Sequence, residues 1–418
     1  MMGARPERSR QRIERMHRID GNAPSAQSAQ SVDGKRKRTL PNSMIDQIHS
    51  LPALIREIVD PFDEAIRGAL PREFCVSLQR LFVTGCGDSH HAALATEWAF
   101  ESLAGVPTEP MAALQFARYA AAYVPRGSAV VGVSVSGGVS RTAEALTLAN
   151  QIGAHTIALT ANPGGLVGLA AKQTILVQSP PFPEPPGMIT PGVRSYTANQ
   201  IALILIAAHL GEMRGVITSD DADAVRRELR ALAAAAERTI EASDSAAQTL
   251  AREWADASEF VFTGGGPNFA AALFSAAKVL EASGDSALGQ DTEEWAHLQY
   301  FAKVASTPTF IISAGGRDLS RATEVAVAAR TIGRRVVAVT PPSATGLIAA
   351  ASRSLSFADS AREMFTPVIS AMPCELFAAH RAEAIGEPFF RNFGGGRSIE
   401  GGGGISRIRT SELWETIR

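Results

Sequence analysis

Residues 130–146 combine hydroxyl groups and glycines in an arrangement that could bind an anion. The stretch reads VVGVSVSGGVSRTAEAL, an apolar run typical of a strand that becomes helical from Ser140 onward. The first turn of a helix presents unpaired N–H groups, and glycine lets the backbone approach a ligand closely. The candidate residues are Ser134, Ser136, Gly137, Ser140 and Thr142. Such residues also cap helices for structural reasons, but four hydroxyls around two glycines favour a phosphate site.

A lysine and a glutamate three residues apart form a second candidate for chemistry. Lys278 and Glu281 lie on a predicted helix over residues 268–282, and this spacing puts both side chains on one face. The alternative is a surface ion pair, which is common and contributes little to stability. The residues around the pair are apolar, which favours a position beside the core.

The elements that must position these residues alternate between strand and helix. We expect strands over 80–84, 129–134, 155–160 and 171–178, and helices over 43–58, 90–103, 142–152 and 196–210, with a proline-rich loop over 179–191. That order predicts an α/β fold with a mostly parallel sheet flanked by helices. Ligands of such sheets bind at the carboxyl ends of the strands, where the candidate turn lies.

An internal repeat extends this fold class to two tandem domains. The segment from Thr84, TGCGDSHHAALATEWAFESLAG, aligns with TGGGPNFAAALFSAAKVLEASG from Thr263, and the segment from Ser136 aligns with the one from Ala314. In the second copy Ala314 stands where the first copy has Ser136, and Arg317 and Asp318 occupy an inserted turn. The second copy has therefore lost a hydroxyl and gained a carboxylate that repels anions, so we expect only the first copy to bind phosphate.

The predicted organisation has five parts. They are a disordered basic tail over 1–42, a first domain over 43–215 with the candidate phosphate loop, a helical connector over 216–257, a second domain over 258–370 with the Lys278 helix, and a C-terminal helix with a glycine-rich tail over 371–418. The basic tail over 1–42 is rich in Arg, Lys, Ser and Gln with few large apolar residues, which is typical of disorder. A second glycine run, 401–404, is either a flexible flap over the site or a disordered C-terminal tail.

Composition excludes several classes of function. Lys plus Arg number 40 and Asp plus Glu 42, a formal charge of −2, so no global positive field favours nucleic acid. The apolar run near residues 201–210 is too short to cross a membrane, and three scattered cysteines suit a reducing compartment. We therefore expect a cytoplasmic protein without a metal, a cofactor, or a nucleic-acid or membrane partner.

The chain resembles tandem sugar isomerase (SIS) domain proteins over roughly residues 43–397. It is similar to the isomerase half of glutamine–fructose-6-phosphate aminotransferase and to the fructosamine-6-phosphate deglycases. The markers are Gly85-Cys86-Gly87-Asp88-Ser89, Ser134-Val135-Ser136-Gly137, Gly192-Val193-Arg194-Ser195-Tyr196-Thr197, and Lys278 with Glu281. No segment of this sequence resembles the glutaminase domain of the aminotransferases, so we do not expect glutamine-dependent amination.

The resemblance assigns roles to individual residues. It implies that the Gly87, Asp88 and Ser89 turn, with Ser134 and Ser136, binds phosphate and hydroxyls, that Ser140 or Thr142 takes the last phosphate contact, and that Ser195 lies near the sugar. It places the base at Glu281, which would move a proton between adjacent carbons through an enediol, with Lys278 stabilising the oxyanion or tuning the base. It also implies that His297, sixteen residues after Glu281, opens the sugar ring in the neighbouring subunit's site of a homodimer.

Three departures from the family pattern bear on the substrate. Val135 replaces a glutamine, and Asp88 replaces a hydroxyl residue, so we expect Asp88 to face sugar hydroxyls rather than phosphate. The lysine that opens the ring is missing near Arg397, whose pKa is too high for a proton donor. The interpretation is an aldose–ketose isomerase or a ketosamine-6-phosphate deglycase, and the alternative is a phosphosugar-binding regulator without turnover.

Overall fold

The computed structural model describes residues 42–359, 362–398 and 410–417, and residues 42–418 form one compact unit. The predicted basic tail, apart from Asn42, and the glycine run 401–404 lie outside the described residues. Within the described part, no helix is long and apolar enough to cross a membrane.

The first sheet has five parallel strands in the order β2-β1-β3-β4-β5. They are β1 (Arg80–Gly85), β2 (Thr108–Ala112), β3 (Ser128–Val133), β4 (His155–Thr160) and β5 (Gln173–Leu176). Four of them confirm the strands expected from sequence. The edge strand β2 was missed because TEPMA has neither an apolar run nor alternation, and its proline is tolerated only at a sheet edge.

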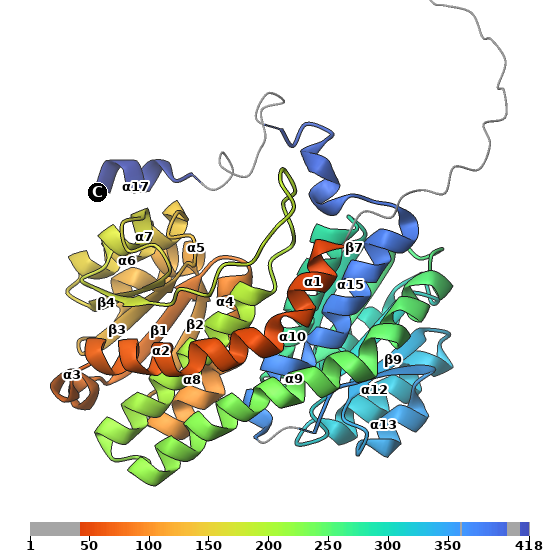
Figure 1. Cartoon of the computed structure of the whole chain (residues 1–418), viewed down its shortest axis with the longest axis horizontal. Coiled ribbons are helices and arrows are strands. Elements are labelled where there is room, and N and C mark those ends of the chain that lie inside the picture. Colours follow the sequence, from red (N-terminus) through yellow and green to blue (C-terminus); the bar gives the residue numbers. More distant parts are fainter. Residues whose placement is uncertain (1–41, 360–361, 399–409, 418) are drawn as a thin grey trace, which may run out of the picture. The chain divides into compact units, whose positions relative to one another are not determined.

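Helices cover both faces of this sheet (Figure 1). They are α1 (Ser43–His49), α2 (Leu51–Ala69), α3 (Arg72–Ser77), α4 (Asp88–Ala99), η1 (Phe100–Ala104), α5 (Ala113–Gln115), η2 (Phe116–Ala120), η3 (Ala121–Tyr123), α6 (Ser140–Gln151), α7 (Leu166–Ala170) and α8 (Arg194–Arg214). Alternate residues of β3 enter different cores: Val131 and Val133 join the core with α2, α4 and α8, whereas Val130 joins the core with α6 and α7. Both faces of the sheet are thus buried.

The second sheet repeats the first one strand for strand. Its members are β6 (Glu259–Gly264), β7 (Ser286–Asp291), β8 (Pro308–Ile312), β9 (Arg335–Thr340) and β10 (Arg353–Ser356), all parallel, in the order β10-β9-β8-β6-β7. Read from the other edge, this is the topology of the first sheet, which confirms the internal repeat. Its helices are α10 (Asn268–Ala282), α11 (Thr292–His297), η4 (Gln299–Phe301), α12 (Leu319–Thr331) and α13 (Thr345–Ala350).

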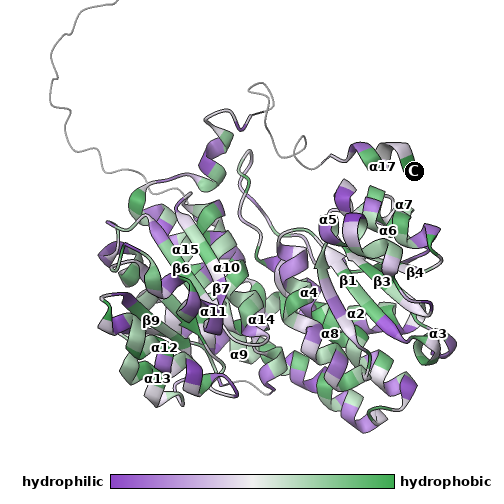
Figure 2. Ribbon diagram, turned by 180° about the vertical axis from the view of Figure 1, so that it is seen from behind, coloured by the Kyte–Doolittle hydropathy of each residue, from purple (hydrophilic) through white to green (hydrophobic). Residues whose placement is uncertain are grey.

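Long helices join the two halves through one continuous core. The connector is α9 (Ser219–Glu253), which begins with a capping box between Thr218 and Asp221. The chain ends with η5 (Glu363–Phe365), α14 (Pro367–Ser370), α15 (Met372–Ile385), η6 (Phe389–Phe393) and α17 (Glu412–Ile417). Figure 2 shows apolar residues concentrated where α8, α9 and α10 meet. The Tyr196 ring of α8 stacks on the Phe274 ring of α10 with centroids 3.7 Å apart, so α10 is fixed against the first half.

Candidate functional site

The loops that follow β1 and β3 lie side by side at the carboxyl edge of the first sheet. Thr84 of β1 is paired with Gly132 of β3, so the two strands end next to each other. The packing there is tight, because a Cβ on Gly85 would lie 3.1 Å from the Val133 carbonyl oxygen and 2.8 Å from Ser89 Cβ. The sheet therefore brings the Gly85–Ser89 turn to the 134–142 loop, as the sequence predicted.

Glycine is required at two points of these loops. Gly87 is the N-cap residue of α4 and has φ +55°. A residue with a side chain would be strained in this backbone conformation. Gly137 has φ +66°, and a Cβ on it would lie 2.7 Å from the Asn162 carbonyl oxygen. Both glycines let the loops turn toward α4 and α6. The first turns of these helices carry backbone N–H groups of the kind that bind anions.

The hydroxyls of the 134–142 loop differ in their surroundings. Ser134 and Thr142 are buried, and neither hydroxyl has a hydrogen-bond partner among the described residues. Ser140 is buried at the first position of α6. Ser136 is exposed, and its Oγ accepts a hydrogen bond of 3.3 Å from Gly138 N–H. Buried hydroxyls without partners are rare, so Ser134 and Thr142 each place an unused hydrogen-bonding group at this loop.

The equivalent loop of the second half is already filled by its own side chain. Ser134 N–H bonds to the Leu159 carbonyl, and Ser313 N–H bonds in the same way to Val339, so the two serines are equivalent at their strand ends. Ser313 Oγ donates to Asp318 Oδ1 at 2.7 Å, whereas Ser134 Oγ is unpartnered. Burial raises the pKa of Asp318 to about 6. A carboxylate therefore occupies the second loop, which supports the expectation that phosphate binds only in the first.

Lys278 projects from α10 in the second half to the first-half turn. Its Nζ lies 2.8 Å from Asp88 Oδ2, 2.5 Å from Glu281 Oε2 and 3.2 Å from the Gly192 carbonyl oxygen. The lysine side chain is fully buried, whereas those of Asp88 and Glu281 are 25% and 31% exposed. The ammonium also lies 4.7 Å from the Phe274 ring centroid. A surface ion pair is excluded, because surface lysines are not fully buried.

The structure assigns Asp88 a contact that sequence reasoning did not foresee. Its carboxylate bonds to Lys278, and the expected contact with sugar hydroxyls stays a prediction. The two carboxylates overcome the cost of burying the ammonium and raise the pKa of Lys278 above its ordinary value. The lysine is therefore a cation, suited to stabilising an oxyanion rather than to acting as a base.

Three further titratable residues surround this cluster. Glu375 on α15 is buried, and burial raises its pKa to about 8. Tyr196 is fully buried, so its pKa lies well above the ordinary value. Burial also lowers the pKa of His91 to about 4, which keeps the imidazole neutral. Glu375 was missed because one glutamate in an apolar helix carries no signal of its own; the isolated charge within MPCELFAAH was the available hint.

The remaining predicted residues lie in different surroundings. Ser89 and Ser195 are half-buried in the first turns of α4 and α8. His297 ends α11 and is 66% exposed, with Nε2 at 3.0 Å from Glu293 Oε1. Its described hydrogen bond is thus to its own helix rather than to the Lys278 cluster. Arg397 bonds to the Gly394 carbonyl oxygen at 2.9 Å.

The C-terminal segment docks beside the phosphate loop. Arg141, in the first turn of α6, donates to Glu144 Oε2 at 3.0 Å and to Ser411 Oγ at 3.1 Å. The buried Glu144 carboxylate also accepts hydrogen bonds from Arg118 and Ser411. Trp414 of α17 joins the core beneath α6. The Arg141 side chain is consequently committed to holding the chain's end.

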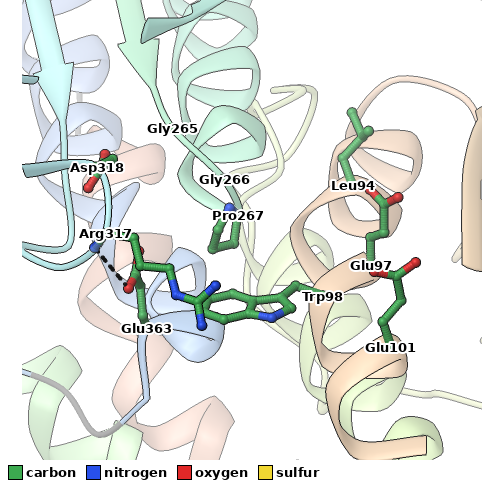
Figure 3. A pocket seen from close by; sticks show the side chains of 10 residues that line it. All are labelled: Leu94, Glu97, Trp98, Glu101, Gly265, Gly266, Pro267, Arg317, Asp318 and Glu363. Carbon is green, nitrogen blue, oxygen red and sulfur yellow. Dashed lines mark hydrogen bonds between the residues drawn. The ribbon is translucent and has the colours of Figure 1, made fainter. Parts of the chain in front are cut away.

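A cleft of about 330 Å³ lies at the filled second loop (Figure 3). The residues that line it are Leu94, Glu97, Trp98 and Glu101 of α4, Gly265, Gly266 and Pro267 after β6, and Arg317, Asp318 and Glu363. Figure 3 shows the Arg317 guanidinium over the Trp98 ring, at 4.5 Å from the ring centroid. Four carboxylates and one cation make this cleft unsuited to phosphate. The described residues contain no cluster of side chains able to hold a metal ion.

Comparisons with known proteins show which sequences this chain resembles. Residues 76–210 match the SIS domain family. The chain is 28% identical over 356 residues to glutamine–fructose-6-phosphate aminotransferase (isomerizing) from Gloeobacter violaceus, an alignment that covers 84% of this chain and 57% of that protein. The chain thus spans little more than half the length of the curated relatives it matches. The SIS match is confined to residues 76–210, whereas the similarity to the aminotransferase extends over most of this chain.

Solved structures share the fold of the whole described unit. The C-terminal domain of glucosamine-fructose-6-phosphate aminotransferase from Francisella tularensis superposes with a TM-score of 0.71 at 16% identity, covering 84% of this chain and 98% of that one. Glucosamine-6-phosphate deaminase from Thermotoga maritima superposes with a TM-score of 0.61 at 16% identity, covering 82% and 95%. The two-sheet architecture is therefore that of these proteins.

Proposed function

We propose that this SIS-domain protein is an enzyme that acts on phosphorylated sugars. The observation that supports this best is the difference between the two equivalent serines: the buried Ser134 hydroxyl has no partner within the described structure, whereas that of Ser313 is already bonded to Asp318. The phosphate is held by the first loop, through Ser134, Ser136, Ser140, Thr142 and the N-terminus of α6. The sugar extends from there toward the Gly87–Ser89 turn and Ser195.

The reaction we propose is a proton transfer between C1 and C2 of the bound sugar. Glu281, about a third exposed and bonded to Lys278, takes the proton from one carbon and returns it to the neighbouring carbon through an enediol. Lys278, fixed as a cation by Asp88 and Glu281, stabilises the negative charge that develops on the oxygen.

Two reactions use this proton transfer. An aldose–ketose isomerase would release the isomerised sugar phosphate. In a ketosamine-6-phosphate deglycase the same proton transfer gives an imine at C1, which water hydrolyses to release the amine and the aldose phosphate. The similar proteins act on fructose 6-phosphate or glucosamine 6-phosphate by their names. A phosphosugar-binding regulator is the second candidate, favoured by the missing lysine near Arg397, and the buried Lys278–Glu281 pair argues against it.

We also propose that the active unit is a homodimer with shared sites. His297 is exposed at the end of α11, and the exposed apolar side chains of Leu298, Tyr300 and Phe301 follow it directly. An exposed apolar patch of this kind is typical of a surface that meets another protein. In such a dimer His297 opens the sugar ring in the partner's site.

Hydrogen exchange from a deuterated solvent tests the proposed function. The protein is incubated in deuterated water with a panel of aldose, ketose and ketosamine 6-phosphates, and deuterium at C1 and C2 is followed by NMR. We expect incorporation into at least one substrate at a rate that depends on protein concentration. Tight binding without exchange would instead establish the regulator.

A further inference from the structure

We propose that Glu375 is a positioning residue for the Lys278 site. As a neutral acid it leaves Lys278 bonded to Asp88 and Glu281; as a carboxylate it competes for Lys278 and separates it from Glu281. The kinetic part of this inference rests on the proposed function, whereas its effect on folding does not. Glu375 has no role in the phosphate loop or in the proton transfer described above.

Glu375 lies on the helix that packs against the Lys278 helix. It is in the first turn of α15, which packs on α10, and its neighbour Cys374 lies beside Ser275, one helical turn before Lys278. The side chain is 1% exposed, and within the described structure its Oε2 has no hydrogen-bond partner and no contact with solvent. A buried oxygen without a partner is uncommon and calls for a role.

Lys278 has no hydrogen to spare for this oxygen. Its ammonium carries three N–H groups, and they go to Asp88, Glu281 and the Gly192 carbonyl oxygen. Glu375 therefore lies in the field of the cation without a bond to it. An ionised Glu375 that bonded to Lys278 would have to take an N–H from one of these acceptors.

The charge balance of the cluster keeps Glu375 neutral while these bonds persist. One ammonium is already shared by two carboxylates, so a third buried carboxylate would have no uncompensated cation. The groups that act on Glu375 are Lys278 of α10 and Asp88 of α4, with Tyr196 of α8 and Cys374 beside it. On α9, which also packs on α15, Asp244 is bonded to His380 and His49. Consistently, burial raises the pKa of Glu375 to about 8.

Ionisation of Glu375 would oppose the reaction in two ways. It adds a negative charge near the developing oxyanion, and it attracts the cation that stabilises that oxyanion. We therefore expect the rate to fall as pH rises through about 8. Of the two acceptors with charge, Glu281 is the more exposed, so it is the one that water can replace as a partner of Lys278.

The test is the pH profile of the Glu375→Gln variant, which keeps the neutral shape without the titration. With the substrate found by deuterium exchange, we expect wild-type kcat/KM to fall about tenfold from pH 7 to pH 9, as one group of pKa near 8 requires, and the variant to fall less than about twofold. The Tyr196→Phe variant is the control, because Tyr196 is an equally buried neighbour; its profile should match wild type. Equal alkaline falls in wild type and Glu375→Gln would overturn the proposal.

Thermal unfolding without substrate separates this inference from the proposed function. Because the pKa of Glu375 is raised on folding, the stability it contributes is full below about pH 4 and is lost as pH rises through about 8. The Glu375→Gln variant should lose less Tm than wild type between pH 5 and pH 9. If no substrate is turned over but the variant loses less Tm than wild type, the proposed reaction fails and the coupled charge cluster stands. If wild type and Glu375→Gln lose the same Tm between pH 5 and pH 9, the role of Glu375 is overturned. The Glu375→Met variant, similar in volume, replaces the glutamine variant if that one does not fold, with the same expectations.

Discussion

Lys278 Nζ lies 2.8 Å from Asp88 Oδ2, a bond between residues 190 positions apart that joins the second half of the chain to the first. The first half supplies the 134–142 loop with its unpartnered hydroxyls, and the second supplies the buried cation and Glu281. The proposed site therefore draws on both halves. This bond also explains why a carboxylate is tolerated in a turn that faces a phosphate loop, since the lysine neutralises it.

Removal of one carboxylate from this pair should destabilise the fold. We expect Asp88→Asn to lower the free energy of unfolding by about 1–2 kcal/mol, less than for a fully buried pair because Asp88 is a quarter exposed and Glu281 remains. Urea denaturation measures this. The control is Asp60→Asn, which breaks an exposed pair with Arg230 and should change stability by less than about 0.5 kcal/mol. Similar losses in both variants would show that the Lys278 pair has no special weight.

Glu281→Gln should separate binding from turnover. Loss of a general base costs about 10²- to 10⁴-fold in kcat, while calorimetric affinity for the phosphosugar should stay within about threefold because the phosphate loop is intact. Glu324→Gln, an exposed carboxylate of α12, is the matched control and should leave both quantities unchanged. Unchanged turnover in Glu281→Gln would place the base elsewhere.

The open hydroxyls should carry phosphate affinity. We expect Ser134→Ala and Thr142→Val each to weaken phosphosugar binding about tenfold, as a lost hydrogen bond to a charged group implies. The equivalent change in the second half, Ser313→Ala, should leave affinity within about twofold, because that serine serves Asp318. Calorimetric titration with the same sugar phosphate gives all three values. A larger effect from Ser313→Ala than from Ser134→Ala would show that the phosphate binds in the second half and would contradict the prediction.

Asp318 should make stability depend on pH. Burial raises its pKa to about 6 from an unfolded value of about 3.9, so the folded state holds its proton more tightly. Its contribution is therefore full below pH 4 and is lost as pH rises through 6. Relative to wild type, Asp318→Asn should gain about 1–2 kcal/mol in the free energy of unfolding between pH 4 and pH 7.5. A constant difference across that range would mean that Asp318 does not titrate there.

Shared sites predict complementation between inactive variants. His297→Ala and Glu281→Gln should each be inactive alone on a substrate supplied in its ring form. Mixed dimers, formed by unfolding and refolding the two together, should regain about a quarter of wild-type activity per subunit if one site in each heterodimer is intact and assortment is random. A monomer by light scattering, or no recovery in confirmed heterodimers, would contradict the shared site.

The sequence by itself determined the fold class and most of its elements. Long apolar runs and helical periods identified the strands at 80–84 and 155–160 and the helix 268–282, because such patterns follow directly from which faces are buried. The comparison of the two copies predicted that only the first loop binds phosphate, and this stays a prediction. The edge strand β2 was missed because its short sequence has no periodicity.

Only the tertiary structure decided what surrounds the reactive residues. That Asp88 meets Lys278, that Asp318 fills the second loop through Ser313, and that Glu375 lies unpartnered behind the lysine all depend on contacts between segments far apart in the chain. Local spacing places Lys278 and Glu281 on one helical face, but burial of that face depends on how α4, α8 and α15 pack against α10. Because burial and neighbouring charges set the charge state of each group, the chemistry of the site is a property of this packing.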